Sequence, residues 1–471
     1  MFTSSTLGLG RDLYNAIFSD EVFWPSEPRS IIDLGLPPTL TEALLLKRLL
    51  VTGQCSGRQL ATDLCLPFSI LDGVFLDLRS RQLIVHRGAA PFNDYFYALT
   101  DQGRDRATAY MQACAYTGPM PVPISDYQLS VEAQTIRAEQ PKRDNLKRAF
   151  RDITIDTNLF ENLGPAINSG AGMFLYGEPG NGKSTLARRV TQCFGQHIWI
   201  PHALYEDGQI IKVYDGAVHQ AVESEGAEAG GQTDHDCRWI RIRRPTVVVG
   251  GELTMDALEI RFDPISKISE APLQVKSNCG CLLIDDFGRQ RIEPHELLNR
   301  WIIPLEMRCD FLTLSTGKKI PLPFEQLVIF STNLEPADLV DEAFLRRIPY
   351  KIEIGNPTAE EFHRLFQLYC EQFECEYRPD IIQAVIQEHY IRSGRSMRRC
   401  HPRDLLQQIR AYCAYHERPL ELHKEYFDIV AKNYFTDVLM DRRPKSKNGS
   451  ATGPSKTCGR TISLQNQAAP E

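Results

Sequence analysis

A glycine-rich loop, Gly177-Glu178-Pro179-Gly180-Asn181-Gly182-Lys183-Ser184, directly follows the apolar run Met173-Phe174-Leu175-Tyr176. The loop matches the phosphate-binding pattern G-x-x-x-x-G-K-[ST], in which glycines let backbone N–H groups curl round phosphate oxygens. Lys183 is expected to reach the β and γ oxygens, and the Ser184 hydroxyl to ligate Mg²⁺. Residues 185–193 are predicted to form a helix whose N-terminus faces the anion. Because strand, loop and helix occur in the required order, we favour a nucleotide site over a chance match.

Two later apolar runs end in polar side chains that suit the same site. Residues 281–284 form a buried-strand pattern followed by Asp285 and Asp286. Residues 327–332 form another, followed by Asn333. We expect Asp285 to hold Mg²⁺ through water, Asp286 to orient the attacking water, and Asn333 to hold that water or the γ-phosphate. The competing interpretations are a strand with a polar end for the two acids and a turn or cap residue for the Asn.

The composition restricts the class of protein. The chain has 471 residues, enough for two or three domains, and a formal net charge of -7, so it is no global polycation for nucleic acid. No apolar run approaches the ~20 residues that span a bilayer, and residues 1–5 do not begin a signal peptide. We therefore expect a cytoplasmic protein with no membrane insertion. The 13 cysteines include no C-x-x-C pair, so we expect reduced thiols rather than zinc ligands.

The N-terminal part of the chain is predicted to be an arm, residues 1–38, and a winged-helix-like module, residues 39–115. Helical spacing predicts three helices, at residues 40–50, 56–64 and 69–79. A hairpin is predicted from residues 82–86 and 95–99, and residues 100–104 begin a fourth helix. A winged helix binds DNA through its third helix. Acidic and basic residues nearly balance here, which is unfavourable for neutralising phosphates. We therefore favour protein docking, with DNA binding as the alternative.

The remaining chain is divided by its proline-rich joint and by changes in periodicity. We expect a linker and connector helix over 116–158, with a polar helix or connector at 131–152, and a nucleotide-binding core over 159–355. Residues 197–200 are predicted to be the second strand of the core. Residues 203–275 are predicted to be an insertion with its own hairpins, including the β-like runs 239–243 and 246–249. This insertion either contacts substrate or packs as an extra layer on the sheet. A helical lid is expected over 356–440 and a disordered tail over 441–471.

Five residue clusters, in this order along residues 150–435, resemble those of the AAA+ ATPases. The resemblance implies an α/β fold with a P-loop core, a parallel sheet and a helical lid, and it implies ATP and Mg²⁺ as ligands. Gly177, Glu178, Pro179, Gly180, Asn181, Gly182, Lys183, Ser184 and Thr185 fall at the Walker A loop. The resemblance further places Asp285 and Asp286 at Walker B, Asn333 at sensor 1, Arg346 or Arg347 at the arginine finger that serves a neighbouring subunit, and Arg403 at sensor 2.

One position departs from the AAA+ pattern. The family usually has Glu after the Walker B Asp, whereas Asp286 is one methylene shorter. The water-orienting carboxylate therefore stands further back, and slow or partner-gated hydrolysis is the hypothesis that follows.

The whole chain is also similar to bacterial proteins described as predicted chaperone-like ATPases, often associated with Flp-type pilus assembly. Four stretches carry this similarity: residues 116–123, 200–214, 283–290 and 400–405. It implies an ATP-dependent remodeller of protein assemblies that acts as a homo-oligomeric ring, expected to be a hexamer, on an unspecified protein client. The alternatives are an ATP-regulated DNA-binding protein that uses the winged-helix module, and a nucleotide-sensing scaffold with little turnover.

Overall fold

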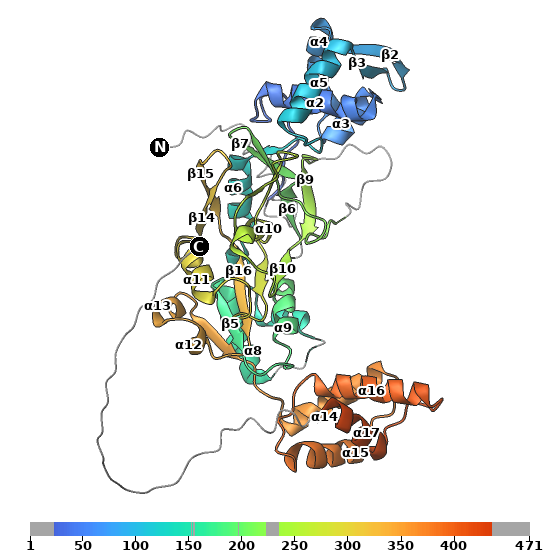
Figure 1. The fold of residues 1–471 in the computed structure, drawn as a ribbon, viewed down its shortest axis with the longest axis vertical. Coiled ribbons are helices and arrows are strands. Elements are labelled where there is room, and N and C mark those ends of the chain that lie inside the picture. The colour runs from blue at the N-terminus through green and yellow to red at the C-terminus, as the bar shows by residue number, and fades with distance from the viewer. Residues whose placement is uncertain (1–22, 152, 154–155, 196, 223–234, 436–471) are drawn as a thin grey trace, which may run out of the picture.

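The computed structural model describes residues 23–151, 153, 156–195, 197–222 and 235–435. An N-terminal α+β module and a C-terminal group of helices lie at opposite ends of the view, with an α/β region between them (Figure 1). The tail expected over 441–471, the first 22 residues of the expected arm and most of the loop at 223–236 lie outside the described residues.

The N-terminal module contains four helices and a three-stranded antiparallel sheet of order β1-β3-β2. Two of its helices begin at side-chain caps that the local sequence supplies: Ser56 caps the N-terminus of α3, and Thr100 caps the N-terminus of α5. Three helices, a hairpin and a fourth helix follow one another in the predicted order; α2, α3 and α4 begin and end within two residues of their predicted bounds, and α5 begins one residue after its predicted start. The elements are α2 (Pro38–Thr52), β1 (Gln54–Ser56), α3 (Gly57–Leu64), α4 (Phe68–Ser80), β2 (Ile84–Ala90), β3 (Asp94–Leu99) and α5 (Asp101–Ala113).

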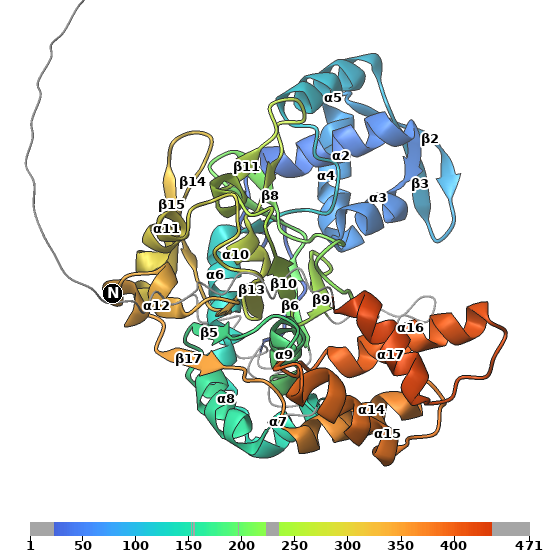
Figure 2. The ribbon, with the colours of Figure 1, turned by 60° about the horizontal axis from the view of Figure 1, so that its bottom comes forward.

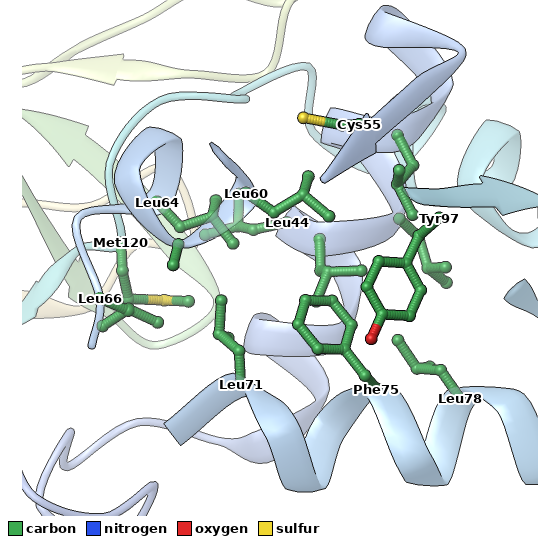
Figure 3. Close-up of a cluster of buried hydrophobic side chains, with 14 of the residues drawn as sticks. Leu44, Cys55, Leu60, Leu64, Leu66, Leu71, Phe75, Leu78, Tyr97 and Met120 are labelled. Carbon is green, nitrogen blue, oxygen red and sulfur yellow. The ribbon is translucent and has the colours of Figure 1, made fainter. Parts of the chain in front are cut away.

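The core of this module joins α2, α3 and α4 to its sheet (Figure 3). Phe75 of α4 stacks on Tyr97 of β3 with ring centroids 4.3 Å apart. The Glu42 carboxylate of α2 accepts hydrogen bonds from Arg81, Arg106 and Tyr110. Burial raises the pKa of Glu42, but these hydrogen bonds outweigh burial and lower it to about 2. The module is therefore held by an apolar cluster and by one buried, fully partnered carboxylate.

The central region is built on five parallel strands in the order β10-β13-β16-β5-β17. Four of the five are short, mostly apolar runs, as expected for strands covered on both faces, whereas the edge strand β17 exposes Lys351 and Glu353. Leu283 and Ile329 face a cluster with α8 and α9, whereas Leu282 and Phe330 face the opposite cluster with α11. The expected α/β class, with a parallel sheet and a helical C-terminal part, is confirmed. The strands are β5 (Met173–Tyr176), β10 (Thr246–Val249), β13 (Cys281–Ile284), β16 (Leu327–Thr332) and β17 (Tyr350–Glu353), and the helices are α8 (Thr157–Ser169), α9 (Lys183–Val190) and α11 (Pro294–Met307).

The prediction for the second strand of this sheet was wrong. Strand β6 (His197–Pro201) pairs antiparallel with β9 (Trp239–Arg243) in a separate two-stranded sheet. The place next to β13 is taken by β10, which was assigned to the insertion. Both runs are apolar, so periodicity could not assign them to sheets. Trp199 of β6 instead packs with Trp239 and Val122, which draws β6 out of the core.

A second five-stranded sheet, of order β11-β12-β8-β7-β4, lies between the central sheet and the N-terminal module (Figure 1). The insertion supplies four of its strands, and the proline-rich linker supplies the fifth, which pairs parallel with β7. Asp207 and Gly208, both with positive φ, close the β7–β8 hairpin. The strands are β4 (Val122–Pro123), β7 (Ala203–Glu206), β8 (Gln209–Lys212), β11 (Arg261–Phe262) and β12 (Ser269–Glu270).

The connector expected at 131–152 is not one helix. It is broken first at Gln134 and Thr135, where the Thr135 side chain caps a new turn, and again around Pro141, because proline cannot continue a helix. Its pieces are α6 (Ile124–Ala133), η1 (Ile136–Ala138) and α7 (Arg143–Ala149). The other short elements of the central region are η2 (Thr191–Cys193), η3 (Met255–Leu258), α10 (Leu273–Lys276), β14 (Cys309–Thr313), β15 (Lys319–Pro323), α12 (Pro336–Leu339) and α13 (Glu342–Leu345).

The C-terminal part is helical and has its own apolar core, which includes Phe362, Tyr390, Leu406 and Phe427. Thr358 and Glu361 form a capping box at its first helix. Figure 2 shows this lid beside α7 and α9. Its helices are α14 (Ala359–Gln372), α15 (Pro379–Val385), a π-helical turn η4 (Ile386–Ile391), α16 (His401–Tyr415) and α17 (Lys424–Tyr434).

Among the described residues, no single helix has the length and apolar composition needed to cross a membrane, whereas one bent pair, α3 with α4, meets that test jointly.

Candidate functional site

The glycine-rich loop joins β5 to α9 and has the backbone that its sequence predicts. Gly177, Gly180 and Gly182 have φ values of 133°, 86° and 86°. A Cβ at Gly177 would lie 2.5 Å from the Ile354 carbonyl oxygen, and one at Gly180 would lie 2.6 Å from the Cys400 sulfur. Glycine is therefore required by conformation and by space at both positions. The loop ends where α9 begins at Lys183, so free N–H groups of the helix face it.

Lys183 is buried below this loop. Its Nζ atom donates to the Gly177 and Glu178 carbonyl oxygens, at 2.8 and 3.0 Å, and to Asn333 Oδ1 at 2.7 Å. Burial lowers the pKa of Lys183, and the charges of Asp286 and Asp285 oppose that effect. The hydrogen-bond partners of this cation among the described residues are all neutral. A buried cation with neutral partners, next to helix N–H groups, fits an anionic ligand.

Ser184 and Asp285 form the second half of the site. The Ser184 hydroxyl donates to Asp285 Oδ1 at 2.8 Å. Asp285 directly follows β13, so its carboxylate lies at the carboxyl edge of the parallel sheet, beside the loop that follows β5. A hydroxyl and a carboxylate oxygen are ligands that suit Mg²⁺.

Asp286 and Asn333 lie on neighbouring strand ends. Asn333 Nδ2 donates to Asp286 Oδ1 at 3.2 Å while its Oδ1 accepts from Lys183. Asp286 is exposed and has a left-handed φ of 51°, which Asp tolerates better than most residues. One amide side chain thus links the lysine to the acid expected to orient water.

A cavity of 580 Å³ lies between this edge of the sheet and the lid. That volume suits a small-molecule ligand. The cavity is lined by loop residues 179–185, by both acids and Asn333, and by lid residues that include Tyr369, Arg399 and Arg403. The structure therefore brings together the residues that the sequence placed at Walker A, Walker B, sensor 1 and sensor 2.

The two arginines at the finger position lie elsewhere. Neither Arg346 nor Arg347 lines the cavity of its own chain. Arg347 forms an ion pair with Glu306 at 2.6 Å, and Arg346 is exposed just after α13. Arg403 does line the cavity, but its guanidinium pairs with Asp404 at 2.9 Å and is about half exposed.

Sequence reasoning missed the contacts between the lid and the loop. Asn181 is buried; its Nδ2 donates to Asn356 Oδ1 at 2.8 Å, and its Oδ1 accepts from the Arg399 backbone N–H at 3.2 Å. The Cys400 N–H donates to the Gly180 carbonyl at 2.9 Å. Asn181 thus joins the loop, the start of the lid and the turn before α16. The arginine-rich run before Cys400 was the available signal.

One family model matches residues 358–433, which are the lid, and it is described as a domain of unknown function (DUF8689). The search of curated proteins gave no match.

Several solved structures share a similar arrangement at low identity. NtrX from Brucella abortus in complex with ATP is 13% identical, with 64% of this chain and 60% of that chain covered and a TM-score of 0.36. The RuvB P216G mutant of Thermotoga maritima is 12% identical, with 64% of this chain and 71% of that chain covered and a TM-score of 0.32. The complex of the magnesium chelatase subunits BchI and BchD is 18% identical, with 57% of this chain and 88% of that chain covered and a TM-score of 0.29. The chain spans about half of another NtrX structure, 49% of its length. Such low scores say nothing about activity.

Proposed function

We propose that the chain binds Mg-ATP in the cavity between sheet and lid and hydrolyses it. The observation that carries this proposal is the polar circuit at the carboxyl edge of the sheet, Lys183 to Asn333 to Asp286, beside the Ser184–Asp285 hydrogen bond. Residues 177–185 would hold the phosphates through backbone N–H groups and Lys183. Ser184 and Asp285 would hold Mg²⁺, which supplies charge neutralisation on the phosphates.

Asp286 and Asn333 are assigned to the attacking water. Asp286 is exposed and near the loop, so its carboxylate would accept the water's hydrogen bond, and Asn333 would keep the carboxylate in place. Because Asp is shorter than Glu, turnover is proposed to be slow until a partner or a second subunit moves the loop after β13 inward. The same short side chain supports the alternative of a scaffold that binds ATP and hardly turns it over.

Arg346 and Arg347 are assigned to the cavity of a neighbouring copy. They lie outside their own cavity, and Arg346 is exposed at the end of a short helix. Hydrolysis would then depend on assembly into a homo-oligomeric ring, which we take to be a hexamer. Arg403, on the lid side of the cavity, would sense the nucleotide and couple it to lid movement.

We further infer that the ring remodels protein assemblies, as the chaperone-like ATPases associated with Flp-type pili are described to do. The winged-helix-like module and the second five-stranded sheet are the surfaces proposed to engage the client. Residues 39–115, with nearly balanced charge, suit docking to protein better than binding to DNA.

The test is steady-state ATP hydrolysis per subunit as the protein concentration rises, with Lys183→Ala as background. We expect a rate that climbs, then saturates, and is absent from the variant, because each site would be completed by a neighbour. Bound ATP with turnover no higher than that of Lys183→Ala at every concentration would contradict the hydrolytic proposal and favour the scaffold.

A further inference from the structure

A second and larger cavity, of 880 Å³, lies on the side of α9 away from the glycine-rich loop. Six arginines line it: Arg148, Arg151, Arg188, Arg189, Arg243 and Arg244. They come from three segments, α7 and the turn after it, the last turn of α9, and the end of β9. We refer to this cavity as the arginine hollow. Its lining contains no described lysine, aspartate or glutamate.

Most of these charges have no described counter-charge. Arg244 is structural, because it pairs with Glu139 and donates to the Cys279 carbonyl at 2.6 Å. By contrast, the structure shows no ion pair between a described residue and any of Arg148, Arg151, Arg188 and Arg243, and all four are exposed. The acid nearest in sequence to the lining loop 216–220, Asp215, is already paired with Lys276 at 2.8 Å.

This concentration of charge is opposite in sign to the protein as a whole. The net charge is -7, yet one concave surface gathers four guanidiniums that form no ion pair with any described residue. Like charges that face one another cost free energy, and a concave site of one sign focuses its potential on ions of the opposite sign. The arrangement therefore suits an anion with several charges close together.

The chemistry favours phosphate over carboxylate. The planar guanidinium fork donates two parallel hydrogen bonds to a phosphate group and keeps its charge at every physiological pH. Every nucleotide of a nucleic-acid strand carries a phosphate charge whatever its base, whereas a peptide carries closely spaced charges only where acidic residues are consecutive. Four guanidiniums around one cavity of 880 Å³ match a polyanion that is charged at every repeat.

We propose that the arginine hollow binds the phosphodiester backbone of a nucleic-acid strand. This site is separate from the winged-helix-like module and does not depend on the proposed ATP site. The two cavities share one lining residue, Arg189, so a bound strand would lie directly behind the helix that follows the phosphate loop.

The test is fluorescence anisotropy of the full chain with a labelled oligonucleotide of about 20 nucleotides, longer than the ~4–16 that a typical single-strand site covers. Single-stranded and duplex forms are titrated between about 50 and 200 mM salt. We expect binding that weakens steeply with salt. The double variant Arg148→Ala/Arg243→Ala should weaken it by about tenfold and reduce the single-strand salt slope by about 1.4, at about 0.7 per lost contact.

The matched control is Arg79→Ala/Arg87→Ala, which removes two exposed arginines from α4 and β2 of the winged-helix-like module. It should bind as the unaltered chain does. Arg148→Lys/Arg243→Lys should keep the salt slope with weaker binding, because charge is retained and the fork is lost.

Four outcomes would overturn the proposal. The first is that neither oligonucleotide binds, and the second is that the control variant loses binding while the hollow variant keeps it. The third is that poly-L-glutamate displaces the strand equally well at matched charge. The fourth is that the hollow variant loses self-association while its binding is unchanged. Displacement by poly-L-glutamate would make the hollow a site for acidic protein. Loss of self-association would make it a subunit interface.

Discussion

At the scale of single residues, the site depends on side-chain reach and on backbone conformation. Lys183, Asn333 and Asp286 form one hydrogen-bonded chain, so a change at any of them alters the other two. Asp286 combines a short side chain with a left-handed φ of 51°. Asp is among the residues that tolerate this conformation, so the local backbone and the short reach are linked.

The Asp286 side chain should limit turnover. In Asp286→Glu we expect turnover to rise severalfold because the carboxylate reaches further, while Tm falls slightly because Glu is less suited to a left-handed φ. Asp286→Asn should lower kcat by about 100-fold or more, since it removes the base. The measurement is steady-state hydrolysis with Asp256→Glu, an exposed position on η3, as the matched control. A fall in kcat for Asp286→Glu would show that Asp is already at the right distance.

At the scale of secondary-structure elements, three residues of the phosphate loop contact the lid: Asn181, Gly180, and Glu178, which accepts from Asn356 and pairs with Arg398. Asn181 donates to Asn356 and accepts from the Arg399 N–H, and Cys400 donates to Gly180. Gly180 has no room for a side chain against Cys400. The turn before α16 therefore follows any movement of the loop, which gives a direct route from the proposed nucleotide site to the lid.

Asn181→Ala should loosen the lid. Each lost hydrogen bond costs about 0.5–1.5 kcal/mol, because Asn356 is exposed and Arg399 is half-buried, so water can satisfy them. We expect faster hydrogen exchange at the start of α16 and a higher KM for ATP, with a smaller change in kcat. Asn168→Ala, at an exposed position of α8, is the matched control. Unchanged exchange at α16 in Asn181→Ala would mean that the lid is held by other contacts.

At the scale of the whole molecule, the proposed function requires a second chain to complete each site. The cavity is lined by residues from the central sheet and the lid, whereas Arg346 and Arg347 lie outside it. If they act on a neighbour, a subunit without a working phosphate loop can still supply its arginines. This leads to a test that depends on assembly alone.

Mixing Lys183→Ala with Arg346→Ala/Arg347→Ala should restore hydrolysis. Each variant should be inactive by itself, since one lacks the phosphate contact and the other lacks the charge supplied to its neighbour. In mixed assemblies some interfaces combine an intact loop with intact arginines, so activity should reach a maximum near equal proportions. The measurement is the rate against mixing ratio at constant total protein. Activity that stays at background for every ratio, with mixed assemblies shown by cross-linking, would rule out this role for the arginines.

The sequence by itself determined the fold class and the chemistry of the phosphate loop. Glycine spacing, Lys183 and Ser184 are contiguous, so local backbone geometry specifies their arrangement. The acids and Asn333 were also found because parallel strands bring their carboxyl ends to one edge. These predictions rested on interactions that short stretches encode.

Only the tertiary structure decided which strands share a sheet and which distant charges meet. Strands β6 and β10 are equally apolar, and the packing of Trp199 against Trp239, not periodicity, separated them. The sequence indicated only a polar helix or connector at 131–152, and it is the packing of α7 against α9 and β9 that brings their arginines to the same hollow. Asn181 likewise gained its partners from the lid. Such contacts join residues far apart in the chain, and their energy depends on burial and neighbours that local sequence patterns do not contain.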